Sequence, residues 1–193
     1  VRHLVARGLD VAVMKPVASG CLPTPEGLRN EDALALMRAS NLQQRYEEVN
    51  PIALEPAIAP HIAAAQANVR IDPDRLSAIA RWVDADVLVV VGVGGWCVPL
   101  GGGLMLSDLA RALTDEVVLV VGVRLGCINH ALISADRIKR DGMKLAGWVA
   151  NLVDPDMPAL EENLSTLEEH LPAPMLGTVA QGDATGNFLL SME

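Results

Sequence analysis

Runs of apolar residues alternate along the chain with segments whose apolar residues recur at helical spacing. Each run is short and rich in valine, leucine or alanine, which is typical of strands. The runs predict strands at 11–14, 86–91, 116–123, 145–151 and 174–179. Because the first three runs are apolar at nearly every position, they are typical of buried strands in a parallel sheet.

The segments between these runs predict helices. Asn30 is a good N-cap residue, and Glu31 and Asp32 place acidic side chains in a first helical turn. Ser107 is a second candidate N-cap, and Gly142 is expected to end a helix. Apolar spacing predicts helices from 30 onward and over 60–66, 72–83, 107–113, 129–140 and 160–171.

The alternation of strands and helices decides the expected fold class. It predicts right-handed βαβ units, and therefore an α/β fold with a doubly wound, mostly parallel sheet and helices on both faces. Segments 21–27 and 99–103 are rich in proline or glycine and are expected to be loops. Without an internal repeat or a low-complexity linker, the simplest prediction is a single α/β domain over 1–193.

Residues 1–8 resemble the last turns of a helix that ends at Gly8. A helix that begins at its end predicts that further residues precede it. By ordinary element lengths, a strand, a loop and most of a helix, on the order of 25 residues, would complete the pattern.

Composition narrows the function classes. The chain is 51% hydrophobic but only 3% aromatic, so its core is expected to be aliphatic. A net charge of −9 without a basic run disfavours nucleic acid and anionic membranes as partners. No apolar run is long enough for a transmembrane helix. Three cysteines without metal-type spacing favour reduced thiols, and hence a cytoplasmic protein.

Lys15 is the first candidate for chemistry, because it directly follows the first apolar run. Pro16 prevents a helix from starting at once, so Lys15 and Ser19 are expected in a stiff segment at the carboxyl end of a strand. In open α/β sheets this edge is where ligands bind. From the residues alone, a solvated lysine at a strand end is an equal alternative.

Two further features allow more than one interpretation. Asp32 could compensate a helix dipole, which its position favours, or it could lie near Mg²⁺ as an oxygen ligand. Gly94 and Gly95 follow the second apolar run and would let the backbone approach a phosphate closely, although tight turns use glycine too.

Six separated stretches together resemble, in order and spacing, the dethiobiotin synthetase family. They cover nearly the whole chain and so support one another. The stretches are Lys15–Gly20, Thr24–Ala33, Pro60–Ile62, Gly94–Leu100, Gly126–Ala131 and Gly147–Asn151.

The resemblance implies a fold and a reaction. The fold is a P-loop α/β domain that works as a homodimer in the cytoplasm. The reaction is a ligase step of biotin synthesis, in which ATP and Mg²⁺ drive ring closure of 7,8-diaminononanoate with CO₂. Positioning and charge neutralisation carry most of the catalysis in such phosphoryl transfers.

The resemblance also implies roles for individual residues. Lys15 would be catalytic, stabilising the carbamate and the transferring phosphate. Asp32 would hold Mg²⁺ and contact the nucleotide, with Asn151 and Ala180 as further nucleotide contacts. Substrate contacts are implied for Ser19, Gly94, Gly95, Gly126, Cys127, Ile128 and Asn129. For Cys127, a small buried packing residue is the plainer interpretation, because the family segment uses mostly backbone groups.

Two departures from the family pattern change the expectation for activity. No Gly-x-x-x-x-Gly-Lys-[Ser/Thr] string occurs in the sequence, although the family places this phosphate loop before the first helix. Val91 stands where the family has a glutamate that binds Mg²⁺, and Val93 replaces a smaller alanine. The sequence therefore predicts that the native protein is a synthetase, and that residues 1–193 turn over ATP poorly.

Two alternatives remain open from the sequence. One is a catalytically inactive relative that keeps the fold as a binding or scaffold protein. The other, weaker, is a partition-type or nitrogenase-iron-protein-type ATPase, which would not need the substrate segment at 127–130.

Overall fold

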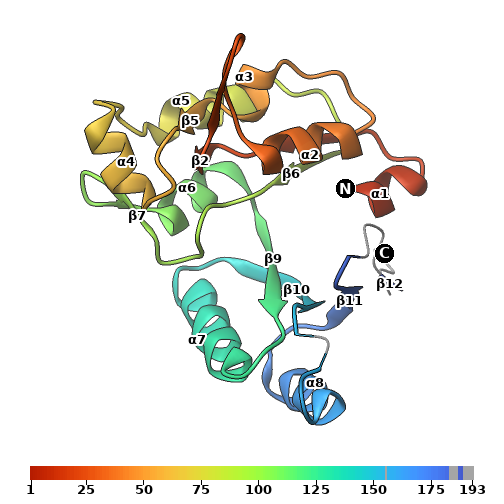
Figure 1. The fold of residues 1–193 in the computed structure, drawn as a ribbon. Coiled ribbons are helices and arrows are strands. Elements are labelled where there is room, and N and C mark those ends of the chain that lie inside the picture. Colours follow the sequence, from red (N-terminus) through yellow and green to blue (C-terminus); the bar gives the residue numbers. More distant parts are fainter. Residues whose placement is uncertain (155, 183–186, 189–193) are drawn as a thin grey trace. The chain divides into compact units, whose positions relative to one another are not determined.

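The computed structural model describes residues 1–154, 156–182 and 187–188, and it resolves into two compact units (Figure 1). The first unit is Val1–Thr114 and the second is Asp115–Glu193. Both contain parallel strands and helices. The single domain expected from the sequence stays a prediction.

The strands of the first unit pair mainly in parallel. Strand β1 (Val11–Met14) pairs with β6 (Val87–Val90), and β2 (Val17–Ser19) pairs with β5 (Ile52–Leu54). All four residues of β1 are buried, as the apolar run predicts. Lys15 and Pro16 separate β1 from β2, so the expected strand end is followed directly by a second strand.

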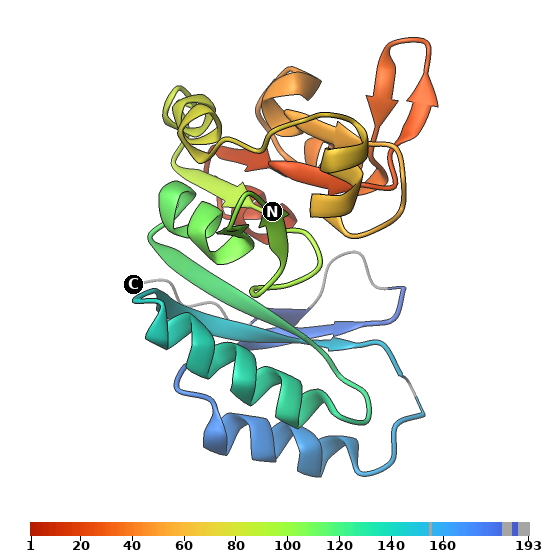
Figure 2. The same cartoon turned by 90° about the vertical axis from the view of Figure 1, so that its left-hand side faces the viewer.

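Two antiparallel hairpins occupy segments expected to be loops. Strand β3 (Leu22–Thr24) pairs with β4 (Gly27–Arg29), and β7 (Pro99–Gly101) pairs with β8 (Leu104–Met105). The first hairpin, orange-red in Figure 2, projects from its unit. Such short strands contain proline and glycine and lack apolar alternation, so the sequence signals only their turns.

The helices of the first unit mostly follow the expected caps. They are α1 (Arg2–Ala6), α2 (Glu31–Ala39), α3 (Tyr46–Val49), α4 (Pro60–Gln66), α5 (Pro73–Arg81) and α6 (Leu106–Leu113). The Ser107 cap was wrong: α6 has Met105 as its N-cap, and the Met105 N–H donates to Asp108 Oδ2 over 2.9 Å. Ser107 is buried inside the first turn.

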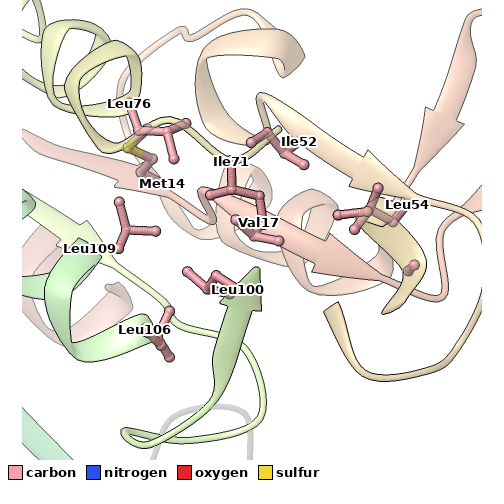
Figure 3. Packing of buried hydrophobic residues seen from close by; sticks show 11 residues of the cluster. Met14, Val17, Ile52, Leu54, Ile71, Leu76, Leu100, Leu106 and Leu109 are labelled. Carbon is pink, nitrogen blue, oxygen red and sulfur yellow. The ribbon is translucent and has the colours of Figure 1, made fainter. Parts of the chain in front are cut away.

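An aliphatic core holds the first unit together, as the low aromatic content predicts. Met14 and Val17 lie on either side of Lys15 and pack with Leu100, Leu106 and Leu109 (Figure 3). Both chain segments that flank Lys15 are therefore fixed by apolar burial.

The second unit is built on a sheet with the strand order β12-β11-β10-β9. Its parallel strands are β9 (Glu116–Gly122), β10 (Lys144–Leu152) and β11 (Met175–Ala180), and β12 (Asn187–Phe188) adds an antiparallel edge. Helices α7 (Cys127–Arg140) and α8 (Leu160–His170) lie on the same side of this sheet (Figure 2). Trp148 on β10 is 0% exposed in their shared core.

Strand β9 is less buried than its apolar run predicts. Val118 is 49% exposed and Val120 is 61% exposed, whereas Val121 is buried. The helix α7 packs against one face of the strand, so the alternate side chains on the other face remain uncovered. Strand β6 is also only half-buried, although β1, its neighbour among the described strands, is buried throughout.

Candidate functional site

Lys15 holds a buried ammonium group at the carboxyl end of β1. The residue is 5% exposed. Its Nζ donates to the Gly92 carbonyl over 3.0 Å and lies 3.1 Å from Asp32 Oδ2. A lysine ammonium has three donors, so these two partners leave one for an oxygen of a ligand.

Asp32 reaches Lys15 from the first turn of α2. The Asn30 side chain caps this helix by accepting from the Ala33 N–H over 3.1 Å. The Asp32 side chain is 68% exposed, so its carboxylate borders solvent while the Lys15 ammonium does not. The pair therefore combines a desolvated cation with a carboxylate that a further cation can reach.

Ser19 carries an unsatisfied hydroxyl at the end of β2. Its Oγ is buried and has no hydrogen-bond partner among the described residues. Buried polar atoms are normally paired, so an orphaned hydroxyl indicates a position prepared for a ligand or water. Ser19 follows Lys15 by four residues in the same buried segment.

The glycine-rich segment after β6 contributes differently from expectation. Gly92 supplies the carbonyl that Lys15 contacts, a role the sequence did not indicate. Gly94 and Gly95 have φ values of 73° and 137°, which side-chain-bearing residues rarely adopt. A Cβ at Gly94 would lie 3.1 Å from Val98 Cγ2, whereas Gly95 is open. The structure gives neither glycine a contact with Lys15.

Cys21 is a neighbour of this group that stays uncharged. Burial raises the pKa of its thiol, and the Leu54 backbone and the Lys15 ammonium offset this only in part. The Cys21 Sγ donates to the Ala18 carbonyl over 3.5 Å. Cys21 therefore packs beside the site without contributing a thiolate.

Asn151 and Ala180 come together in the second unit. Asn151 pairs with Val179 across β10 and β11, and Ala180 pairs with the next residue, Leu152. The Asn151 backbone carbonyl accepts from the Val123 N–H over 2.7 Å. Its side-chain amide makes no hydrogen bond within the described part of the chain, so it is available for a ligand.

The expected substrate segment forms the start of α7. Gly126 is the N-cap with a φ of 91°, and no acidic residue lies in the first turn. Asn129 is exposed, Ile128 is half-buried and Cys127 is buried in the core of the second unit. The packing interpretation of Cys127 is therefore confirmed, while the first turn leaves backbone N–H groups for an anion.

The donor set of the described residues fits Mg²⁺ only through Asp32. No cluster of three or more His, Cys, Asp or Glu residues suited to a metal occurs among them. Val91, the residue expected from the family to be a second carboxylate, is half-buried and offers no side-chain oxygen. Magnesium commonly uses one or two carboxylates together with phosphate oxygens, so a single carboxylate suits a metal delivered with a nucleotide.

Three residues near Lys15 and Asp32 were not predicted from the sequence to contribute to the site. They are Tyr46, Asn50 and Asn30, of which Asn30 was expected only as a helix cap. Tyr46 is the only tyrosine of the chain, and it lies within a charged stretch where it begins α3. A lone aromatic residue in a polar segment is the signal that could have indicated a buried anchor.

Comparison with known proteins gives consistent relatives. A family model described as "AAA domain" matches residues 1–187. A Pseudomonas aeruginosa (strain UCBPP-PA14) protein named ATP-dependent dethiobiotin synthetase BioD is 61% identical over 89% of this chain and 77% of its own length. Proteins of the same name from Cellvibrio japonicus and Xanthomonas oryzae pv. oryzae are 54% and 51% identical, covering 90% and 91% of this chain and 77% and 80% of their own.

One solved structure shares the fold at low sequence identity. It is the septum site-determining protein MinD of Pyrococcus horikoshii OT3, complexed with Mg-ADP. Its TM-score is 0.51 at 14% identity, over 93% of this chain and 72% of that chain. The likeness shows the fold alone, and it confirms the α/β class predicted from the sequence. Within the described ranges, no helix combines the length and apolarity needed to cross a bilayer.

Proposed function

Because the chain belongs to the dethiobiotin synthetase family, a family of ATP-dependent ligases, we propose that it closes the ureido ring of dethiobiotin from 7,8-diaminononanoate and CO₂. The family confirms the resemblance and the enzyme class expected from the sequence. The alternative of a partition-type or nitrogenase-iron-protein-type ATPase is wrong at the family level, since the chain is 61% identical to a protein named as a dethiobiotin synthetase.

The proposed reaction has three steps. One substrate amine adds to CO₂ and loses a proton, which gives a carbamate. A carbamate oxygen attacks the γ-phosphorus of ATP, and ADP leaves. The second amine then attacks the carbonyl carbon, loses its proton and displaces phosphate as the ring closes. Negative charge gathers on oxygen atoms throughout, so a fixed cation is the main requirement.

The observation that carries the proposal is the state of Lys15. Its ammonium is buried, held by Gly92 and Asp32, and has one donor left. A cation shielded from water stabilises nearby negative oxygens far more than an exposed one does. Lys15 is therefore suited to bind the carbamate and the transferring phosphate, while the orphaned Ser19 hydroxyl donates to the carbamate end.

Asp32 is the residue that would hold Mg²⁺. Its exposed carboxylate fits a metal that brings its other ligands from phosphate oxygens and water. The metal would supply neutralisation of phosphate charge. Asp32 itself orients the Lys15 ammonium, because the two side chains lie 3.1 Å apart.

Two segments of the second unit are further proposed binding positions. The first turn of α7, from Gly126 to Asn129, suits the acid tail of diaminononanoate, because helix N-termini attract anions. Asn151 and Ala180 suit the nucleotide, with the unpaired Asn151 amide reading adenine. In the first unit, Gly94 and Gly95 allow substrate to approach the backbone. A homodimer with the acid tail at its interface completes the proposal.

Val91 favours a second candidate: a family member that binds diaminononanoate but transfers phosphate poorly. A valine side chain cannot bind a cation, which leaves Asp32 as the one assigned carboxylate. Phosphate release that depends on diaminononanoate would contradict this candidate. A gain in Mg-ATP affinity in Val91→Glu would support it.

Calorimetric titration with diaminononanoate, with and without Mg-ATP, tests the proposal. With bicarbonate present, we expect substrate binding that Lys15→Met weakens at least about tenfold, because the carbamate then loses its buried cation. Lys144→Met is the matched control, since Lys144 is exposed and pairs with Glu116 in the second unit. Absence of diaminononanoate binding by the unaltered chain would overturn the proposal.

A further inference from the structure

A buried chain of hydrogen bonds joins the backbone of Lys15 to the helix that carries Asp32. Its members are three polar residues of the first unit: Asn50, Tyr46 and Asn30. All three are buried. None of them contacts the Lys15 ammonium itself, so their effect on the site must pass through the backbone.

Asn50 binds the backbone at the carboxyl end of β1. Its Nδ2 donates to the Lys15 carbonyl over 2.7 Å and to the Ile52 carbonyl over 3.3 Å. The Lys15 N–H in turn donates to the Val49 carbonyl over 2.7 Å. Both backbone polar groups of Lys15 are thus bound to one short segment, 49–50. Two carbonyl acceptors also decide the amide orientation, so Asn50 Oδ1 must face Tyr46.

Tyr46 connects this segment to α2. Its hydroxyl accepts from the Asn30 N–H over 2.7 Å and donates to Asn50 Oδ1 over 3.0 Å. Burial raises the pKa of the phenol, so the hydroxyl keeps its proton at neutral pH. The direction of each bond is therefore fixed, because Asn30 offers only a donor and Asn50 Oδ1 only an acceptor.

The Lys15–Asp32 ion pair completes this connection. Asn30 caps α2, and Asp32 lies in the first turn of that helix, 3.1 Å from the Lys15 ammonium. Five residues thus form a closed circuit: Lys15, Asn50, Tyr46, Asn30 and Asp32. Lys15 and Asp32 form the charged part of this circuit, and the three neutral residues that connect them are buried.

We propose that Tyr46 and Asn50 are positioning residues, which hold the Lys15 ammonium and the Asp32 carboxylate at the separation that carbamate binding requires. This inference rests on the proposed function of the Lys15 site. The tyrosine hydroxyl is the decisive atom, because it bonds both to Asn50 beside the strand end and to Asn30 at the helix start. Without it, the hydrogen-bonded connection between these two points is broken, although β1 and α2 still pack against each other.

The tyrosine ring has a separate packing role. The Arg29 guanidinium lies 4.1 Å from the ring centroid, and the ring packs with Val13, Ala33 and Val49. Tyr46→Phe keeps these contacts and removes only the hydroxyl. It is therefore the variant that separates positioning from packing.

The test compares diaminononanoate binding with and without bicarbonate in the unaltered chain and in Tyr46→Phe. The unaltered chain is expected to bind more tightly with bicarbonate, because the carbamate then forms against Lys15. Tyr46→Phe is expected to lose most of this gain, so its affinity for diaminononanoate with bicarbonate should fall about tenfold. Its affinity without bicarbonate should stay within about twofold of the unaltered chain.

Ser77→Ala is the matched control. Ser77 is also a buried hydroxyl of the first unit, and its Oγ donates to the Ala112 carbonyl over 2.9 Å between α5 and α6. A variant of this kind should lose comparable thermal stability but keep the full bicarbonate gain. Equal losses of the gain in both variants, or a gain kept in Tyr46→Phe, would overturn the positioning role.

A second measurement uses the unaltered chain and needs no variant to fold. Tyr46 is the only tyrosine, so isotope-labelled tyrosine gives one set of NMR signals. We expect diaminononanoate with bicarbonate to shift these signals, and diaminononanoate alone to leave them nearly unchanged. Signals that ignore bicarbonate while binding tightens would contradict the inference. Absence of any bicarbonate gain would instead overturn the proposed function.

Discussion

The carboxyl ends of β1 and β10 hold polar residues in opposite ways. At the end of β1, Lys15 is buried, and its backbone and ammonium all have partners. At the end of β10, the Asn151 backbone is bound in the sheet, but its side-chain amide has no partner among the described residues. The Lys15 side chain is therefore held in place before a ligand binds, whereas the Asn151 amide is available to a ligand.

The difference follows from the chemistry proposed for each end. A cation that stabilises developing charge acts best when it is fixed and dry before the substrate arrives. An amide that recognises a base must offer unpaired donors and acceptors, because each ligand bond would otherwise displace an internal one. Four variants or conditions test this contrast.

The largest effect is expected from Asn50→Leu, which removes the side chain that binds the backbone at the end of β1. The exchange removes three hydrogen bonds and leaves the Lys15 carbonyl and the Tyr46 hydroxyl buried without them. We expect a loss of about 3 kcal/mol in the free energy of unfolding, measured by denaturant titration. A loss below about 1 kcal/mol would show that water replaces these bonds.

The second largest effect on stability is expected from high pH, which acts on the Tyr46 hydroxyl near the end of β1. The folded-state pKa of Tyr46 is raised, so above the ordinary phenol pKa of about 10 the unfolded chain loses this proton first. The Tyr46 contribution to stability is therefore complete below that pH and is lost as pH rises through the folded-state pKa. Denaturant titrations at pH 8 and above pH 10 should show a smaller drop in Tyr46→Phe than in Ser77→Ala.

Ser19→Ala sharpens the contrast inside the first unit. Its hydroxyl has no described partner, so the free energy of unfolding should change by less than about 0.5 kcal/mol. The bicarbonate gain in diaminononanoate binding should nevertheless fall, because the donor to the carbamate is lost. A large loss of stability would show that the hydroxyl is structural.

Asn151→Ala is expected to have the smallest effect on stability. The backbone bonds of β10 remain, and the side chain leaves no partner behind, so the change should stay within about 0.5 kcal/mol. Affinity for Mg-ATP, measured by calorimetry, should fall about tenfold, the value of one or two lost hydrogen bonds. Unchanged Mg-ATP binding would remove Asn151 from the nucleotide site.

The sequence predicted the elements better than their burial. Strand β1 and the Asn30 cap follow from local patterns, because apolar runs and capping residues act within a few positions. The exposure of Val120 could not be predicted, since it depends on which face of β9 the helix α7 covers. The packing of a helix on one face of a strand is a long-range property that an apolar run does not encode.

The site shows the same division. Lys15 was a candidate from its position at a strand end, and Asp32 became one through the family resemblance, since its helix position alone favoured dipole compensation. The structure brings the two side chains together. The carbonyl of Gly92 and the hydroxyl of Tyr46 were missed, because each acts on Lys15 from a segment more than 25 residues away along the chain. A backbone carbonyl carries no residue-specific signal, and a tyrosine between charged residues does not point to a lysine.

The most direct test of the central claim is to observe the carbamate at Lys15. Carbon-13 bicarbonate and diaminononanoate are added to the unaltered chain and to Lys15→Met, and a protein-bound carbamate signal is sought by NMR. The account predicts this signal in the unaltered chain and its loss in Lys15→Met. An equal carbamate signal in both proteins, or none in the unaltered chain, would contradict it.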